Sequence, residues 1–329
     1  MQIVAADIGG THARFALAEL RPGERPRLGE MRKYRTRECV GLAEAWAKFE
    51  RDSDGALPRA ASIAVAAPIE GDVLTFMNSG WRIDRHGLAG DLGLDSLTLL
   101  NDYGAVAHAV SVATPDELQP IAGPGALPAD GVTSVMGPGT GLGVAILDRR
   151  GGLVNVIETE AAHIGFCPLD PEEEELSDAL TARYGRASVE RVVSGPGLID
   201  IYRFLGGGDW DPNQAGTLWE AAIDGADPLA EKALSILVRC FGAAAGDIAL
   251  AHGATGVAIA GGLANRIAPL LASPMFEARF TAKGRYRARM LRTPVRLLTP
   301  EEPGLLGAAI AFQHEMTLRS ADEKNSRKK

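Results

Sequence analysis

The chain has 329 residues and a formal net charge of −8. This acidic balance argues against general nucleic-acid binding, which requires a basic face. A hydrophobic content of 46% and a charged content of 23% are ordinary for soluble globular proteins. The length allows two domains with a sizeable core.

The three cysteines, Cys39, Cys167 and Cys240, lie far apart and form no C-x-x-C pair. They indicate neither a disulfide framework nor a zinc site, and they fit a reducing compartment. No apolar run is expected to reach the length of a membrane span. The first acid, Asp7, comes before any signal-peptide core could form. We therefore predict a cytoplasmic protein that binds neither membranes nor nucleic acid.

The first 112 residues alternate apolar strands with short turns. The turn between the first two predicted strands is Asp7-Ile-Gly-Gly-Thr11, which predicts a hairpin with paired glycines at its tip. A second hairpin is predicted through the turn at residues 68–72. The predicted elements are strands at Ile3–Ala6 and Ala13–Ala18, a helix at Cys39–Arg51, strands at Ala61–Ala67, Val73–Met77 and Leu97–Leu100, and a helix at Tyr103–Val110.

The stretch from Pro115 to Gly131 is rich in proline and has no clear periodicity, so we predict a domain crossing near residue 112. The segment after it repeats the first hairpin: an apolar strand, a glycine-rich tip at Gly137–Gly143, and another apolar strand. This echo predicts two related α/β domains, a small one of residues 1–112 and 303–329 and a large one of residues 113–302. The remaining predicted elements are strands at Val132–Met136 and Val144–Leu147, helices opening at Glu172–Glu175 with a solvated acidic face, at Ser188–Val193 and at Leu229–Ala251, a strand at Gly256–Gly262, a helix from Leu263, a final helix at Pro303–Phe312 and a disordered tail from Ser320 to Lys329.

Three glycine-rich turns each follow a predicted strand, and glycine lets backbone N–H groups approach a bound phosphate. Each turn could instead be only a tight turn. Thr11 and Thr140 add hydroxyl donors to two of them, and Asp7 could hold Mg²⁺ through water. Neither G-x-x-x-x-G-K-[ST] nor G-x-G-x-x-G occurs, so the chain is not a P-loop protein and a dinucleotide site is disfavoured.

Asn101 and Asp102 stand between a predicted strand and a predicted helix. Open α/β sheets bind ligands at the carboxyl ends of their strands, and a helix N-terminus favours an ionised carboxylate. The alternative is that Asp102 only caps the helix.

Three further polar residues are candidates for binding: Glu160, His163 and Glu190. Glu160 and His163 could be metal ligands, but zinc needs a third protein ligand and none is evident. They could instead bond to sugar hydroxyls, each charge-assisted bond contributing about 1.5–3 kcal/mol. Capping or surface pairing remains an alternative for Glu190.

Several motifs occur in one order along nearly the whole chain, from about Ile3 to Phe312. The motifs are Asp7-Ile-Gly-Gly-Thr11, Leu100-Asn-Asp102, Gly137-Pro-Gly-Thr-Gly-Leu-Gly143, Ile157-Glu-Thr-Glu-Ala-Ala-His163, Val189-Glu-Arg-Val-Val-Ser-Gly-Pro-Gly197, Ala260-Gly-Gly262 and Pro303-Gly-Leu-Leu-Gly307. Together they resemble the bacterial glucokinase family, the ATP-dependent group of the hexokinase/actin-like superfamily.

The resemblance implies a two-domain actin-like ATPase (hexokinase-type) fold with a central cleft, and phosphoryl transfer from ATP to the 6-hydroxyl of D-glucose with Mg²⁺. It implies phosphate binding by Asp7, Gly9, Gly10 and Thr11 and by Gly137, Gly139, Thr140 and Gly141, and contact of Gly261 and Gly262 with the adenosine. It implies sugar binding by Asn101, Asp102, Glu160, His163 and Glu190, with Asp102 as the base.

The sequence departs from the family pattern at Ala161, Ala162 and Gly165, which leaves the sugar preference open. A kinase for another hexose or an amino sugar is therefore an alternative, and a non-catalytic sugar sensor is another. The expected partners are small molecules, glucose and ATP, and a homodimer is the candidate assembly.

Overall fold

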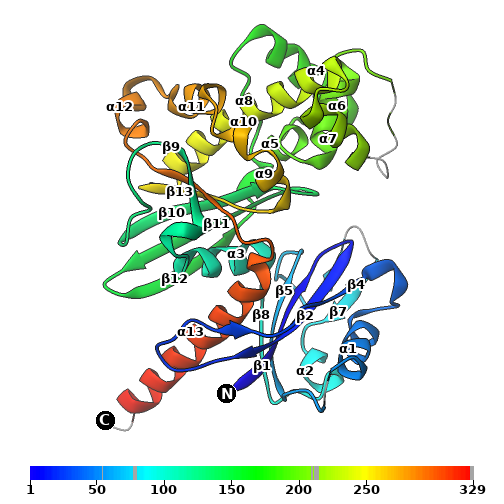
Figure 1. Cartoon of the computed structure of the whole chain (residues 1–329), viewed down its shortest axis with the longest axis vertical. Helices are drawn as coiled ribbons and strands as arrows, with labels where there is room; N and C mark the ends of the chain where they lie inside the picture. The colour runs from blue at the N-terminus through cyan, green and yellow to red at the C-terminus, as the bar shows by residue number, and fades with distance from the viewer. Residues whose placement is uncertain (54, 77–79, 209, 211–214, 327–329) are drawn as a thin grey trace. The chain divides into compact units, whose positions relative to one another are not determined.

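The computed structural model describes residues 1–53, 55–76, 80–208, 210 and 215–326 (Figure 1). The chain divides into two compact units. Unit 1 comprises Met1–Val112 and Glu302–Lys329, and unit 2 comprises Ala113–Glu301.

Unit 1 is a six-stranded sheet with helices on both faces. The strands run in the order β3-β2-β1-β5-β8, with β4 also paired to β2. The hairpin β1–β2 is antiparallel, and β5 and β8 continue the sheet in parallel to β1. Its elements are β1 (Gln2–Ile8), β2 (His12–Glu19), β3 (Arg27–Leu28), β4 (Arg32–Arg35), α1 (Leu42–Arg51), β5 (Ala60–Val65), β6 (Val73–Thr75), β7 (Arg82–Asp84), α2 (Leu88–Asp91), β8 (Ser96–Asn101), α3 (Asp102–Ser111) and α13 (Pro303–Ser326).

Alternation along β1 explains how both faces of this sheet are covered. Val4 and Ala6 pack in one cluster with Trp46 of α1, while Ile3 and Ala5 pack in another with Leu305 and other residues of α13. Successive strand residues point to opposite faces, so a strand that is apolar at every position is buried on both sides. Figure 1 shows α13, in red, running alongside this sheet.

Unit 2 repeats this plan in a sheet of order β12-β11-β10-β13-β14-β9. Its hairpin β10–β11 is antiparallel, and β13 and β14 continue in parallel to β10, as β5 and β8 do in unit 1. The two sheets therefore share one strand order and one pattern of antiparallel and parallel pairing. The elements are β9 (Leu118–Ala122), β10 (Gly131–Pro138), β11 (Leu142–Arg150), β12 (Leu153–Thr159), α4 (Pro171–Tyr184), α5 (Val189–Val192), α6 (Gly195–Phe204), α7 (Ala215–Asp224), α8 (Pro228–Ala251), β13 (Gly256–Ile259), α9 (Gly262–Arg266), α10 (Ala268–Leu271), α11 (Pro274–Thr281), α12 (Arg287–Met290) and β14 (Val295–Leu298), with short 3-10 turns between some of them.

Several predicted elements are corrected. The hairpin between residues 61–67 and 73–77 is wrong: β5 lies between β1 and β8, and β6 pairs with β7 instead. The predicted end of that strand, Met77, lies outside the described residues. The proline-rich stretch contains β9, an edge strand, where a proline costs no ladder bond on the open side.

The predictions for the acidic helix and for the tail are also corrected. Glu173 does not belong to a solvated face, because its side chain is 1% exposed and lies 2.7 Å from Arg279. The tail is helical rather than disordered as far as Ser326, since α13 continues through it.

Helix α8 corrects the expectation that no segment is long and apolar enough to cross a membrane. It has 24 residues and a mean hydropathy of 1.6 over its most apolar window, and 78% of that window is buried inside the protein. Its apolar residues pack against α6, α7 and α11, so α8 serves as the core helix of unit 2.

A pair of histidines lies where α3 packs against α13. The Nδ1 atoms of His108 and His314 are 3.3 Å apart. Burial, with His314 beside it, lowers the pKa of His108 to about 4, and burial also lowers the pKa of His314. Next to His314, Glu315 accepts a hydrogen bond from Thr98.

We predict that unit 1 loses stability as the pH falls from about 6.5 to about 4. In this range both histidines take up protons in the unfolded chain but not in the folded chain. For His108 this lowers the free energy of unfolding by up to about 3 kcal/mol. Urea unfolding at several pH values should show that the free energy of unfolding depends less on pH in His108→Gln than in the unsubstituted protein. Equal dependence in the two proteins would contradict this assignment.

Candidate active site

The tip of the β1–β2 hairpin carries the first group of predicted phosphate-binding residues. Gly9, Gly10 and Thr11 connect the two strands, and the N–H of Gly9 donates to the carbonyl of His12 at 2.9 Å. The hydroxyl of Thr36 donates to the carbonyl of Gly10 at 2.7 Å. The tip is thus fixed by hydrogen bonds to carbonyl groups.

Asp7 lies near the end of β1 and pairs across the hairpin with Arg14, whose Nη1 is 3.5 Å from Asp7 Oδ2. Arg14 Nε also lies 2.7 Å from Glu302 Oε2, so two carboxylates share one guanidinium. Burial raises the pKa of Asp7 to about 6, although Arg14 opposes the shift. A second cation near Asp7 would favour its ionised form.

This environment fits a role for Asp7 toward Mg²⁺. The described residues contain no group of three or more His, Cys, Asp or Glu side chains that could hold a metal ion. Mg²⁺ keeps several of its waters and needs few protein ligands, so one hard carboxylate oxygen beside bound phosphates is enough to hold it.

Asp102 is the first residue of α3, and the cap of this helix is Asn101. The Oδ1 of Asn101 accepts from the N–H groups of Tyr103 at 2.8 Å and Gly104 at 3.3 Å. Its Nδ2 donates to the carbonyl of Ala67 at 3.3 Å. The structure therefore assigns the capping role, left open for Asp102 by the sequence, to its neighbour. Asp102 also accepts from the N–H of Tyr103, at 2.9 Å.

The tip of the β10–β11 hairpin carries the second group, with Gly139, Thr140 and Gly141 between the strands and Gly137 within β10. The N–H of Gly139 donates across the tip to the carbonyl of Gly141 at 2.7 Å, two residues on, whereas Gly9 donates to His12, three residues on. The N–H of Gly195, at the start of α6, donates to the carbonyl of Gly139 at 2.7 Å. One hydrogen bond across the second tip and one from the start of α6 therefore both stabilise it.

Glu190 lies directly against this second tip. Its Oε2 accepts from the N–H of Leu142 at 3.0 Å, and a Cβ on Gly141 would lie 2.3 Å from the same oxygen. This contact corrects both alternatives considered for Glu190, capping and surface pairing. The N–H of Leu142, the first residue of β11, therefore already has a carboxylate partner.

The glycines of the two tips and of Gly261–Gly262 differ in whether the structure requires glycine at their positions. A Cβ on Gly9 would lie 3.5 Å from the carbonyl oxygen of His12, and one on Gly139 would lie 4.0 Å from that of Gly141, both ordinary contacts. On Gly262 it would meet no atom of the described chain within 4 Å. Packing requires glycine at none of these positions, so each leaves room for close approach of a ligand. By contrast, Gly261 has a φ of +106°, which favours glycine by backbone conformation.

Glu160 and His163 lie in and beside a short 3-10 turn after β12, with Glu160 Oε2 3.6 Å from His163 Nε2. Their side chains are 58% and 56% exposed. An ion pair this open to solvent contributes little to stability, so both side chains can bond to a ligand at small cost to the fold. The described part of the chain offers no third ligand for a metal here.

Sequence reasoning missed the neighbours that position these residues. A Cβ on Gly304, in the first turn of α13, would lie 2.9 Å from Asp7 Cγ, and one on Gly307 would lie 1.7 Å from the carbonyl oxygen of Ala105. The available signal was the spacing of glycines in Pro303-Gly-Leu-Leu-Gly307. Nothing in the sequence distinguishes Arg14 and Glu302 from other charged residues.

The repeated units with glycine-rich hairpin tips define an actin-like ATPase fold. The glucokinase family model matches residues 4–315, and the chain belongs to this family. It is 47% identical over 319 residues to a glucokinase of Zymomonas mobilis, covering 96% of this chain and 98% of that protein. It is 38% identical to a glucokinase of Caulobacter, covering 94% of each.

Solved structures agree with this assignment. A glucokinase from an Antarctic psychrotroph has a TM-score of 0.80 and 28% identity, covering 94% of this chain and 98% of that one. A glucokinase from Balamuthia mandrillaris, solved in complex with glucose, has a TM-score of 0.76 and 23% identity, covering 93% and 92%. The second likeness supports the fold alone.

We predict that Gly139→Ala and Gly141→Ala damage nucleotide binding for different reasons. The first adds a methyl group that meets no close protein atom, so it should raise the KM for ATP only if phosphate passes over Gly139. The second displaces Glu190 and should lower thermal stability as well. Steady-state kinetics and melting curves of both variants test this. An unchanged KM for ATP in Gly139→Ala would support the plain-turn alternative.

Proposed function

We infer that this chain is a glucokinase, which transfers the γ-phosphoryl group of ATP to the 6-hydroxyl of D-glucose and releases ADP and glucose 6-phosphate. The observation that carries this inference is the family match over residues 4–315, together with a relative 47% identical over 96% of the chain. A kinase for another sugar and a non-catalytic sensor are not favoured.

We propose that Asp102 is the general base. It would take the proton from the 6-hydroxyl as that oxygen forms its bond to the γ-phosphorus and the bond to the β,γ-bridging oxygen breaks. Its place after β8 is the strand end where open α/β sheets bind ligands. Because Asn101 already caps α3, the carboxylate of Asp102 is not needed as the cap.

The hairpin tips would bind the phosphates. Donors that are fixed before the reaction stabilise developing charge without reorganising, and most catalysis of phosphoryl transfer comes from such positioning. The room above Gly9 and Gly139 supports this role, and Gly261 and Gly262 would lie at the adenosine. When bound, Mg²⁺ would neutralise the phosphate charge beside Asp7.

The sugar would be held by Asn101, Asp102, Glu160, His163 and Glu190. Two of these side chains have atoms already engaged. Glu190 would use Oε1, because Oε2 accepts from Leu142, and the Nδ2 of Asn101 already donates one bond to the carbonyl of Ala67. Asn101 and Asp102 belong to unit 1, and the other three residues belong to unit 2.

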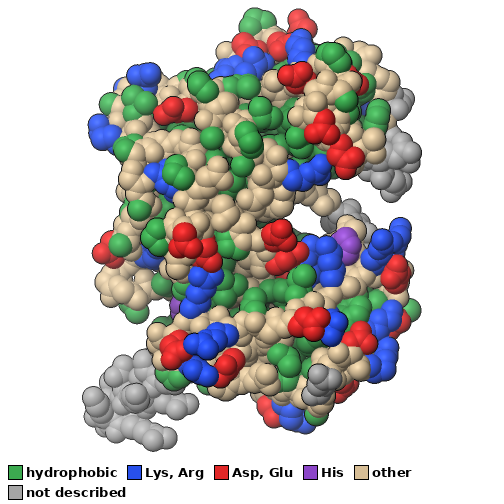
Figure 2. Space-filling view, viewed as in Figure 1, with side chains coloured by type: hydrophobic (Ala, Val, Ile, Leu, Met, Phe, Trp, Pro, Cys, Tyr) green, Lys and Arg blue, Asp and Glu red, His purple; other side chains and the backbone are tan. Residues whose placement is uncertain are grey.

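Two further proposals concern the setting of the enzyme. We propose a cytoplasmic location, which the free thiols of Cys39, Cys167 and Cys240 support. We propose a homodimer as the candidate assembly, which light scattering can test. Lys and Arg side chains are interspersed with Asp and Glu over the face shown in Figure 2, in keeping with small-molecule partners.

We predict that Asp102→Asn lowers kcat at least about 100-fold, because a positioned base typically contributes 10²–10⁴-fold. The melting temperature should barely change, since the amide can still accept from the N–H of Tyr103 and the cap is untouched. Coupled measurement of ADP release gives kcat, and calorimetry gives the melting temperature. A near-normal kcat in the folded variant would rule out this mechanism.

Asn101→Ala is the matched control for stability. It removes the cap and should cost about 1 kcal/mol, so its melting temperature should fall where that of Asp102→Asn does not.

We predict that Glu160→Gln raises the KM for glucose about tenfold or more, the effect of losing one charge-assisted hydrogen bond. The KM for ATP and the melting temperature should stay near their original values, because this side chain is 58% exposed. Steady-state kinetics with each substrate varied in turn test the split. Stoichiometric zinc in the purified protein would instead favour the metal-ligand alternative.

A further inference from the structure

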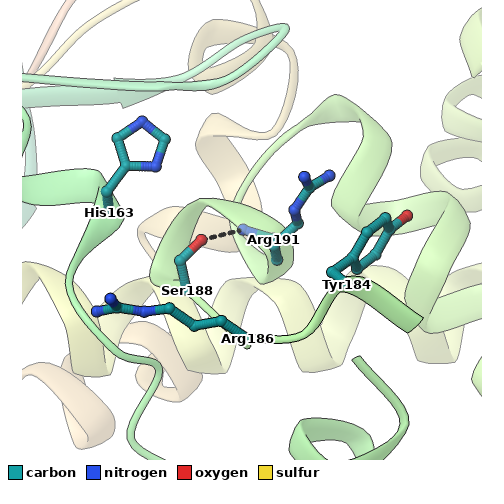
Figure 3. Close-up of a pocket in the computed structure, with 5 residues that line it drawn as sticks. All are labelled: His163, Tyr184, Arg186, Ser188 and Arg191. Atoms are coloured by element: carbon teal, nitrogen blue, oxygen red, sulfur yellow. Dashed lines mark hydrogen bonds between the residues drawn. The ribbon is translucent and has the colours of Figure 1, made fainter. Parts of the chain in front are cut away.

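A pocket of about 300 Å³ lies in unit 2, beside the predicted sugar-binding residues but mostly outside them. Its lining residues are His163, Tyr184, Arg186, Ser188 and Arg191 (Figure 3). Only His163 belongs to the proposed sugar site. The volume is at the lower end for small-molecule pockets.

The fold fixes the two walls of this pocket against each other. One wall is the segment after His163, and the other runs from the end of α4 into α5. The N–H of Phe166 donates to the carbonyl of Ala187 at 3.1 Å, and the N–H of Val189 donates to that of Ile164 at 3.0 Å. Backbone bonds in both directions hold the lining in place without a ligand.

Arg191 is oriented by an aromatic ring that is itself anchored. The guanidinium carbon of Arg191 lies 3.9 Å from the ring centroid of Tyr184, and the hydroxyl of Tyr184 donates to Asp200 Oδ2 at 2.7 Å. Asp200 is 6% exposed and lies 2.8 Å from Arg203. Its charge is therefore balanced behind the ring, and stacking orients Arg191 without neutralising it.

The other polar groups of the lining are mainly hydrogen-bond donors. Within the described part of the chain, Arg186 has no carboxylate within 4.0 Å. Ser188 Oγ accepts from the N–H of Arg191 at 3.4 Å, which leaves its hydroxyl proton available to a ligand. The Nε2 of His163 lies 3.6 Å from Glu160 Oε2. Figure 3 shows the guanidinium group of Arg186 extending to the side of His163 and that of Arg191 to the side of Tyr184, and no carboxylate is among the lining residues.

We propose that this pocket binds a phosphate group, either as free phosphate or as the phosphate of a small phosphorylated metabolite. Arginine presents paired N–H donors that match phosphate oxygens, and the stacking of Arg191 on Tyr184 reduces the entropy that this side chain loses on binding. Because the lining includes His163, a bound phosphate competes with the sugar for that imidazole. Occupancy therefore weakens glucose binding and leaves ATP binding unchanged; this clause rests on the proposed function.

The binding test uses the full chain without ATP. Inorganic phosphate and glucose 6-phosphate are titrated separately by calorimetry at constant ionic strength. At least one should bind saturably, and Arg186→Gln should weaken that binding about tenfold or more, the loss expected for one charge-assisted bond. Binding of phosphate alone, of the ester alone or of both identifies the source of the phosphate group.

Arg285→Gln is the matched control, because Arg285 also lies by a tyrosine, 5.2 Å from the ring centroid of Tyr286, but outside this pocket. It should leave binding unchanged. Absence of saturable binding by both probes, or binding that Arg186→Gln does not weaken, would overturn the proposal. Weakening in both variants would also overturn it, because it would indicate only general attraction to surface charge.

The kinetic test measures the KM for glucose with and without the bound probe. It should rise in the unsubstituted protein and stay constant in Arg186→Gln, whose kcat and KM values without probe should be normal. A KM for ATP that rises equally would contradict the coupling through His163. If the protein does not phosphorylate glucose at all, the proposed function fails, but the calorimetric test still decides the phosphate site.

Discussion

The candidate chemistry of unit 1 depends on how closely the backbone of α13 approaches its neighbours. A Cβ on Gly307 would lie 1.7 Å from the carbonyl oxygen of Ala105, so α3 and α13 meet at a distance that only glycine allows. One turn earlier, Gly304 leaves room for the carboxylate of Asp7. Helix α3 begins at Asp102 and packs against Gly307 of α13. Helix α13 therefore positions both carboxylates that are proposed to act on the phosphates and the sugar, Asp7 and Asp102.

In unit 2 a side chain, that of Glu190, packs against the hairpin tip. Its hairpin tip receives a backbone hydrogen bond from the start of α6 and contacts the carboxylate of Glu190 on α5. The Oε2 of Glu190 accepts from the N–H of Leu142, the first residue of β11. The side chain of Glu190 therefore connects α5 to the tip that is proposed to bind phosphate.

Much of this arrangement was predictable because it depends on local patterns. An apolar strand followed by glycines and a second strand predicts each tip, and Asn101-Asp102 between a strand and a helix predicts the ligand-binding strand end. The sequence could not separate the two roles within that pair, because Asn and Asp cap helices about equally well. Only the coordinates assign the cap to Asn101.

The incorrect predictions share a different cause, because each of these features depends on contacts between residues that are distant in sequence. The strand at 61–67 is adjacent in sequence to β6, yet its partners are β1 and β8. Glu173 looks like one of four solvated acids, but Arg279 lies more than a hundred positions away and pairs with it in the core. Charge patterns report only that an acid is present, and its partner follows from the fold.

The duplicated topology also explains why function can be divided between the units. Each sheet places one glycine-rich tip at the end of its first hairpin, so each unit carries one of the two tips proposed to bind phosphate. The proposed base belongs to unit 1 alone, whereas Glu160, His163 and Glu190 belong to unit 2. The arginine-lined pocket also belongs wholly to unit 2. A ligand in that pocket would therefore act on sugar binding through His163, while the base and the first phosphate tip keep their own supports in unit 1.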